Sequence, residues 1–435
     1  MTAVGTDNIA AAPSPRDRVI PLRKSDLVEG LAAEGRLDAT EQDRLRRFSR
    51  LLGAIFHYDY FEELERLRAA YYPFDPEADP KIAAGNPDLD QAYRDLGAEF
   101  VRVLSDANFI ELTHDEITRA FAERPLVRVK VKAPIASFRE VRMFRRGMHR
   151  EAVNVPRWFG LRQRAVDVDI YDDVVLMVAT RPDRPGPSQG PVSNRIRPGA
   201  VLFKHFRHIA RGDLQALFPN VRVVMSLADQ LTLGVPAVVG GIPILMKLAS
   251  TFTVLFLIAG FYLGVTGAVQ DDEMKQALAA LSGLFALGAF LLRQWGNFHR
   301  QSLMHEKRLT DNIYYRNINN HAGIFNFLIG EAEEQESKET LLAYYGLLTA
   351  PTAPTALTRD ALEQRMEDLL AQVFAVTAEF AVGNALDKLR RLDLLREDAG
   401  QLTVSPLAAA LPLLEREWAA FFRVEPTDDT DEAKR

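Results

Sequence analysis

Two apolar runs separated by a short charged turn constrain this 435-residue chain more than any other feature. Residues 248–269 and 276–292 contain no ionisable side chain, and the turn between them reads QDDEMK. As helices the runs would measure about 33 Å and about 25 Å, against about 30 Å for the hydrocarbon core of a bilayer. Burying the acidic turn in the bilayer would cost several kcal/mol. The pattern therefore predicts a two-helix transmembrane hairpin over 248–292.

The residues that flank and line the two runs favour the same prediction. Lys247, Lys275, Arg293 and Trp295 stand where interfacial side chains anchor a span. Small residues at helical spacing predict a seam along which the two helices approach closely, and these are Gly260, Gly264, Gly267, Ala279, Gly283 and Ala286. The alternative is a helical hairpin buried inside a soluble protein.

Charge and composition bound the compartment and the partners. Basic residues after 292 place both large flanking parts on the cytoplasmic side. The chain has no cysteine, and its N-terminus lacks the basic and apolar regions of a secretory signal. We therefore expect a multi-pass protein of a bacterial-type cytoplasmic membrane with both termini cytoplasmic, or alternatively of the mitochondrial inner membrane. The net charge of −6 gives no reason to expect a nucleic acid.

Outside the hairpin the periodicity predicts an α+β architecture. Apolar residues recur every three or four positions between 45 and 71, as on a helix, whereas VRVKVK at 127–132 alternates as a half-buried strand does. Further strands are predicted at 138–144, 165–171, 174–179, 201–206 and 221–225. The predicted segments are a disordered N-terminus (1–25), a helical region (26–125), a β-rich domain (126–226), a membrane-proximal connector (227–247), a long juxtamembrane helical region (293–348), a winged-helix-like domain (357–423) and an acidic tail (424–435).

The winged-helix-like domain raises the question of DNA binding. Lys388, Arg390 and Arg391 fall on its second predicted helix, but 357–423 carries eight basic and eleven acidic residues. Because DNA binding needs a basic footprint, the segment favours a protein-interaction or a structural role. Spacing assigns Trp418 and Phe422 to the apolar face of its last helix.

Two groups of residues are weak candidates for a metal site. Asp167 and Asp169 share one face of a predicted strand, which is also typical of the solvated face of an edge strand. His205 and His208 lie near each other in sequence, but on a strand they face opposite sides. No phosphate-binding loop, dinucleotide-binding, nucleophile-elbow or HExxH motif occurs, so we predict no catalytic residue and no cofactor.

Several short strings give the chain a family resemblance over about residues 45–422. They are AAYYPFDP at 69–76, DANF at 106–109, FK at 203–204, DL at 213–214, FP at 218–219, IYYRN at 313–317, EAEEQE at 331–336 and AYY at 343–345. In this order they resemble the transmembrane protein 143-like family of bacterial and mitochondrial proteins. The resemblance implies an integral membrane protein of unknown function, with no catalytic residues to transfer.

Three functions are consistent with these features. The first is a membrane-anchored interaction or scaffold protein, with the lipid bilayer and an unknown protein as partners and with homo-oligomerisation possible. The second is a membrane-tethered enzyme, with metal assistance through the candidate ligands above as one form of it. The third is an oligomeric channel or transporter component, against which stands the lack of charge inside either run.

Overall fold

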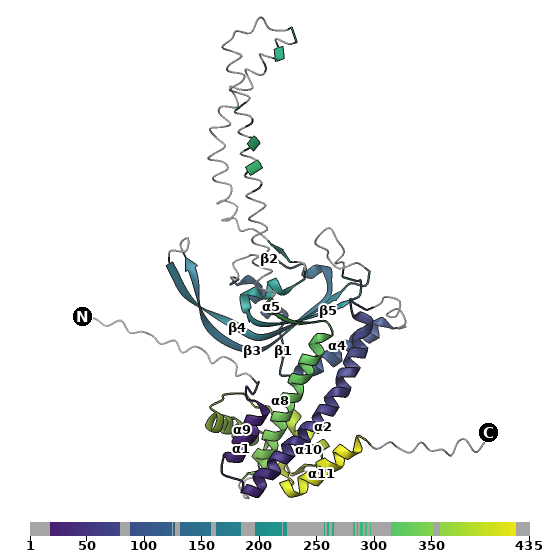
Figure 1. Ribbon diagram of the computed structural model, residues 1–435, viewed down its shortest axis with the longest axis vertical. Coiled ribbons are helices and arrows are strands. Elements are labelled where there is room, and N and C mark those ends of the chain that lie inside the picture. The colour runs from purple at the N-terminus through teal and green to yellow at the C-terminus, as the bar shows by residue number, and fades with distance from the viewer. Residues whose placement is uncertain are drawn as a thin grey trace, which may run out of the picture. The chain divides into compact units, whose positions relative to one another are not determined.

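A computed structural model describes most of the chain outside the two apolar runs (Figure 1). The described residues are 18–78, 88–123, 125–126, 131–157, 162–183, 196–219, 221–223, 315–350, 357–422 and isolated positions between 256 and 296. The chain forms two compact units. The first comprises 1–114, 136–209 and 317–435, and the second comprises 115–135 and 210–316.

A layer of long helices forms the framework of the first unit. Its members are α1 (Lys24–Ala33), α2 (Ala39–Tyr71), α4 (Leu89–Asp106) and α8 (Gly323–Leu348). The carboxylate of Asp38 caps α2 by accepting the Glu41 N–H, and Pro73 lies in the short turn η1 (Tyr72–Phe74) that follows the helix. α8 packs against both α2 and α4, and α2 and α8 lie side by side in Figure 1. Because other elements surround α8, most of its side chains from Leu328 onward are buried.

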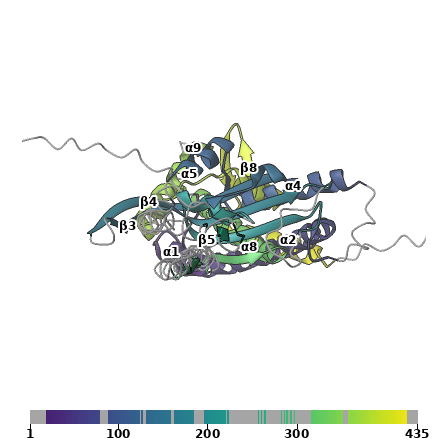
Figure 2. The ribbon, with the colours of Figure 1, turned by 90° about the horizontal axis from the view of Figure 1, so that it is seen from above.

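An antiparallel sheet completes the first unit. Its strands are β1 (Ile110–Glu111), β3 (Phe138–Arg157), β4 (Arg162–Thr180), β5 (Val201–Ala210) and β7 (Asn317–Asn320), ordered β1-β3-β4-β5-β7. β3 and β4 form a long hairpin that pairs Phe138 with Thr180 and Arg157 with Arg162. Figure 2 shows β3, β4 and β5 running side by side. Phe203 of β5 joins sheet and helices, since its ring lies 4.3 Å from that of Phe100 and 5.4 Å from that of Phe325.

The sheet confirms the predicted α+β class and changes its details. The strands predicted at 165–171 and 174–179 are parts of β4, because Asp172 and Asp173 continue the strand instead of breaking it. Residues 317–320 lie within the predicted long helical region but form β7, which pairs antiparallel with β5. The helix α8 therefore begins only at Gly323.

The C-terminal segment shares the core of the first unit. It contains α9 (Arg359–Phe374), α10 (Gly383–Arg391), β8 (Leu395–Asp398), β9 (Gln401–Val404) and α11 (Leu407–Ala420). α10 packs on α8, and α11 packs on α2. Met366, Leu386 and Leu414 belong to the same hydrophobic cluster as Phe48 of α2. The segment is thus built onto the helical layer and has no separate core of its own.

The described elements of the second unit are short. They are α5 (His114–Ala122), which begins one residue before the unit, β2 (Val131–Lys132), η3 (Arg211–Leu217) and β6 (Arg222–Val223), with η2 (Ile135–Ser137) at the boundary. β2 pairs antiparallel with β6. Phe121 meets Phe218 edge to face at 5.9 Å, and Arg211 Nε lies 3.2 Å from Glu123 Oε1.

The predicted transmembrane hairpin over 248–292 is not supported by the helices that the structure describes. None of the helices in the described part of the chain has the length and apolar character needed to cross a bilayer. Within the first predicted span, Leu263 and Gly264 form a turn, and Gly264 has φ +73°. A residue in this left-handed region interrupts the continuous helix that the prediction required. Hydropathy alone did not reveal the interruption.

Most of the hairpin residues lie outside the described part. Gly260 and Arg293 are described and lie in helical backbone, as Gly264 lies in the turn. The anchors Lys247, Lys275 and Trp295 and the seam residues Gly267, Ala279, Gly283 and Ala286 fall outside the described residues, as do the connector 227–247, the tail 424–435 and positions 1–17.

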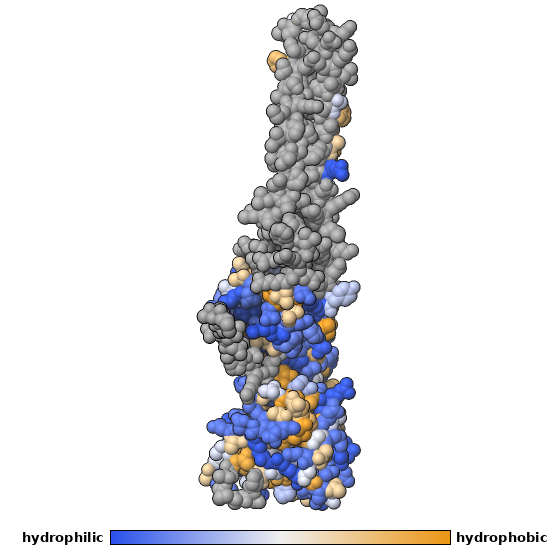
Figure 3. Space-filling model, turned by 90° about the vertical axis from the view of Figure 1, so that its left-hand side faces the viewer, coloured by the Kyte–Doolittle hydropathy of each residue, from blue (hydrophilic) through white to orange (hydrophobic). Residues whose placement is uncertain are grey.

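The described part of the face shown in Figure 3 is mostly polar. On the face shown in Figure 3, hydrophilic side chains prevail and apolar side chains gather into a patch among them. A mixed surface of this kind is ordinary for a folded protein, so the face alone points to no function.

Candidate functional site

A buried ion network centred on Asp173 joins four elements of the fold. Asp173 of β4 accepts hydrogen bonds from Arg146 Nη2 on β3 at 2.8 Å and from Arg207 Nε on β5 at 3.0 Å. His205 Nε2, also on β5, lies 2.8 Å from Asp173 Oδ1. Arg146 Nη1 donates to Glu331 Oε2 of α8 at 2.5 Å. The network therefore ties the sheet to the central helix.

The charged groups in this network stabilise one another in their ionised forms. Burial would raise the pKa of Asp173, but the hydrogen bond from His205 and the charge of Arg146 hold it well below its usual range. Burial would lower the pKa of Arg146, yet Asp173 and Glu331 raise it. Removing one member would leave a buried charge without its partner.

His205 has both ring nitrogens engaged. Nε2 faces Asp173, Nδ1 lies 3.2 Å from Asn319 Nδ2, and the ring stacks on Phe327 at 4.1 Å between centroids. Nε2 of His205 can donate to Asp173 while Nδ1 accepts from Asn319. The side chain is 0% exposed, so the network ties these elements together away from solvent.

The structure does not bring the four candidate metal ligands together. Asp167 lies opposite Ala152 in the β3–β4 ladder, and Asp169 accepts a hydrogen bond from Arg150 at 3.1 Å. His205 is bound to Asp173, and His208 has φ +53° at an exposed position. Among the described residues no group of three or more His, Asp or Glu side chains is arranged to hold a metal ion.

The basic residues of α10 are engaged within the chain. Arg390 pairs with Glu397 at 2.7 Å, and Arg391 pairs with Asp59 of α2 at 2.5 Å. The Lys388 ammonium lies 5.3 Å from the ring centroids of both Phe56 and Tyr60. These contacts engage the basic side chains of α10 within the chain's own fold.

Five aromatic side chains gather where the C-terminal end of α11 meets the middle of α2. The Tyr58 ring lies 4.4 Å from that of Phe421 and 6.1 Å from that of Phe422, and the Trp418 ring lies 5.4 Å from that of Phe422. Phe61 stands one helical turn beyond Tyr58 on α2. Phe61 is 54% exposed and Phe422 is 63% exposed. We call Tyr58, Phe61, Trp418, Phe421 and Phe422 the aromatic surface.

The packing of α11 on α2 sets how far each of these rings is buried. Leu411 and Leu414 are buried against the core, and Arg47 pairs with Glu415 at 2.5 Å, which sets α11 alongside α2. Ile55 and Phe56 occupy the inner face of α2. Trp418 and Phe421 pack against the edge of this core and are half-buried, whereas Phe61 and Phe422 are exposed.

Sequence periodicity did not identify this surface. Trp418 and Phe422 match the apolar spacing of α11, so they were assigned to its buried face, yet Phe422 is exposed. The signal that was available is the excess of aromatic residues in YDYF at 58–61 and WAAFF at 418–422, more than one helix face can bury.

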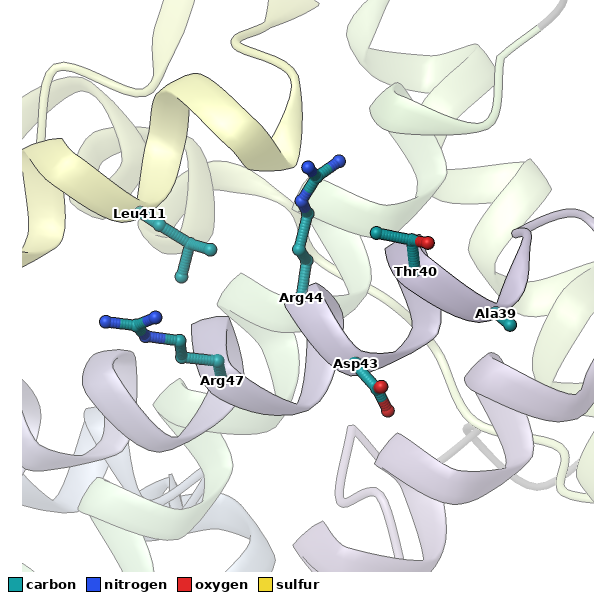
Figure 4. Close-up of a pocket in the computed structure, with 6 residues that line it drawn as sticks. All are labelled: Ala39, Thr40, Asp43, Arg44, Arg47 and Leu411. Atoms are coloured by element: carbon teal, nitrogen blue, oxygen red, sulfur yellow. The ribbon is translucent and has the colours of Figure 1, made fainter.

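A pocket of about 410 Å³ lies between the N-terminal part of α2 and α11 (Figure 4). It is lined by Ala39, Thr40, Asp43, Arg44, Arg47 and Leu411. In Figure 4 the guanidinium groups of Arg44 and Arg47 lie on either side of the Leu411 side chain. Four of its six lining residues carry polar or charged side chains, two of them arginines, and we assign no cofactor to it.

Comparison with known proteins finds a similarity over part of the chain to a family of unknown function. A family described as a protein of unknown function, DUF3754, matches residues 171–323. The match includes Asp173, His205 and Asn319 of the ion network, and it excludes the aromatic surface. No solved structure matches the chain.

Proposed function

We propose that this chain is a non-enzymatic interaction protein that binds a partner protein through the aromatic surface of α2 and α11. The observation that carries the proposal is the exposure of Phe61 and Phe422 within a cluster of five aromatic side chains. Contiguous exposed apolar groups of this kind mark binding sites, and aromatic residues dominate the energetics of protein interfaces.

The rim of the aromatic surface indicates the chemistry of the partner. Glu62 follows Phe61 on α2, and Glu417 precedes Trp418 on α11. A third carboxylate, Glu65, lies one turn further along α2 and pairs with Arg68. An acidic rim around an apolar centre is complementary to a segment that carries lysine or arginine beside apolar residues. We therefore propose a basic amphipathic helix of the partner as the occupant.

We also propose membership of the transmembrane protein 143-like family as the finer assignment of the DUF3754 match. The supporting features are the ordered strings on both sides of residues 171–323, such as AAYYPFDP at 69–76 and AYY at 343–345. This assignment carries no activity and adds no site residue.

The proposed binding is tested with the full-length chain carrying Trp158→Phe and Trp295→Phe, which leaves Trp418 as its single tryptophan. The probe is a synthetic helical peptide with lysine on one face and leucine on the other. Titration is expected to give a saturable change in Trp418 fluorescence. Phe61→Ser is expected to weaken binding by about tenfold or more, equivalent to about 1.4 kcal/mol.

Two controls separate site binding from general stickiness. Val166 of β4 is 42% exposed and does not belong to the aromatic surface. Val166→Ser therefore removes an exposed apolar side chain elsewhere and is expected to leave binding unchanged. A peptide with glutamate in place of lysine is expected not to bind. Equal weakening by Val166→Ser, or equal binding of the acidic peptide, would contradict the proposal. If Phe61→Ser instead dissociates an oligomer in sedimentation, the occupant is a second copy and not a partner protein.

A further inference from the structure

The middle of α8 is polar and yet buried. Residues Gln335, Glu336, Ser337, Lys338, Glu339 and Thr340 are each between 0% and 8% exposed. A helix in a globular protein normally turns such side chains to solvent, and charged side chains are almost never fully buried unless they are paired. This stretch therefore calls for a specific arrangement of partners.

Carboxylates from three helices gather around this stretch. Glu336 and Glu339 of α8 stand one turn apart, with Glu63 of α2 and Asp106 of α4 close enough to interact electrostatically with one or both. Asn384 of α10 donates to Glu336 Oε1 at 3.3 Å. Asn108 donates to Glu339 Oε1 at 2.8 Å. We call Glu63, Asp106, Glu336 and Glu339 the carboxylate cluster.

The cations that face the cluster do not neutralise it. Arg102 of α4 lies 2.6 Å from Glu63 and 2.8 Å from Glu99, so its charge is shared between them. Lys388 of α10 sits over two aromatic rings at 5.3 Å and attracts Asp106 and Glu336. Lys338 turns away, since it donates to the carbonyl oxygens of Ile20 and Leu22 and pairs with Glu334.

Several buried polar atoms at the cluster lack a hydrogen-bond partner within the described residues. They are Glu336 Oε2, Ser337 Oγ and Thr340 Oγ1. Arg102 Nη2 lies 2.6 Å from Glu63 Oε1, and the Tyr60 hydroxyl lies beside Asp106. A buried ionised carboxylate with an unsatisfied oxygen is costly, whereas a proton on that oxygen removes the charge.

The protonation of the two glutamates on α8 is shifted accordingly. Burial, together with the charge of Asp106, raises the pKa of Glu336 to about 7. Burial and the neighbouring Glu336 raise the pKa of Glu339 to about 8. Burial also raises the pKa of Glu63 and of Asp106. Near neutral pH the cluster therefore holds protons that ordinary carboxylates would have lost.

We infer that the carboxylate cluster is a proton-binding site that controls how firmly α10 packs on α8. With Glu336 protonated, Asn384 of α10 donates its hydrogen bond to an uncharged carboxyl group of α8, and this bond joins the two helices. When Glu336 and Glu339 give up their protons to water, two negative charges remain buried one turn apart on α8. The cost of burying them exceeds the attraction of Lys388, and α10 loosens. The inference stands on the cluster itself and does not depend on the proposed binding at the aromatic surface.

Amide hydrogen exchange of the full-length chain between pH about 6 and about 9, corrected for the intrinsic pH dependence of exchange, tests this inference. In the wild type, the protection of the α10 amides is expected to fall by about tenfold or more across this range. In Glu336→Gln with Glu339→Gln the α10 protection is expected to be independent of pH. Glu333→Gln, a half-buried carboxylate on the same helix, is the matched control and should behave as the wild type does.

A second measurement keeps the test decisive if the double variant folds poorly. Infrared spectra of the wild type report protonated buried carboxyl groups directly and need no substitution. The expected result is a protonated carboxyl band that disappears between pH about 6 and about 9. Absence of such a band near neutral pH, or α10 protection that stays constant with pH in the wild type, overturns the inference.

Discussion

Replacing Glu336 by glutamine should stabilise the fold at alkaline pH and have little effect in acid. Glutamine keeps the shape of the side chain and its bond to Asn384, but it removes the group that must ionise. The pKa of Glu336 is about 7 in the folded chain against an ordinary 4.5. At about 1.4 kcal/mol for each pKa unit, ionising this carboxyl in the fold costs about 3 kcal/mol.

The sign follows from proton uptake. Between the ordinary and the folded-state pKa the folded chain holds a proton that the unfolded chain has released, so stability falls as pH rises. Below that window both states are protonated and the cost is absent, and above it the cost is complete. Part of the gain from glutamine is offset because its amide must also be buried, so we expect a net stabilisation of about 2 kcal/mol at pH about 8.

Urea unfolding followed by circular dichroism at pH about 4.5 and about 8 measures the difference between variant and wild type. The expected outcome is a higher midpoint for Glu336→Gln at the alkaline pH only. An equal shift at both pH values would assign the effect to packing and not to ionisation. A lower midpoint at the alkaline pH would refute the protonated state of the cluster.

Three further predictions concern the framework. Arg146→Ala leaves Asp173 buried without its main partner and should lower the free energy of unfolding by about 3–5 kcal/mol in urea titrations, a loss that Arg146→Lys recovers only in part. Phe203→Ala opens a cavity between sheet and helices and should cost about 3–5 kcal/mol, and a cost below about 1 kcal/mol would contradict that packing. Asp38→Ala removes the cap that accepts the Glu41 N–H and should cost about 1 kcal/mol, whereas Asp38→Ser should be nearly neutral.

The regular elements were accessible from sequence because they depend on local periodicity. The apolar stripe between 45 and 71 predicted α2, and alternation predicted the positions of β3, β4 and β5. The continuity of β4 was missed because Asp173 lies within it. An aspartate can be buried in this strand because Arg146 and His205 bond to it. The tertiary fold brings those two side chains to Asp173, so local sequence does not reveal them.

The burial of the polar stretch on α8 could not be predicted from the sequence, because it too depends on contacts that the tertiary fold creates. Its partners come from distant parts of the chain, Asn108 at the end of α4 and Asn384 on α10. Read alone, EAEEQESKET is typical of a solvated helix. The prediction of a membrane hairpin was wrong because it inferred a continuous helix from hydropathy alone. Gly264, with φ +73°, interrupts that helix.

The dissociation constant of the Trp418-only chain for the lysine–leucine helical peptide tests the central claim most directly. The account predicts saturable binding that Phe61→Ser and Phe422→Ser each weaken by about tenfold or more, with Val166→Ser unchanged. Binding that is indifferent to Phe61 and Phe422, or no fluorescence change at Trp418, would show that the aromatic surface of α2 and α11 is not a docking site.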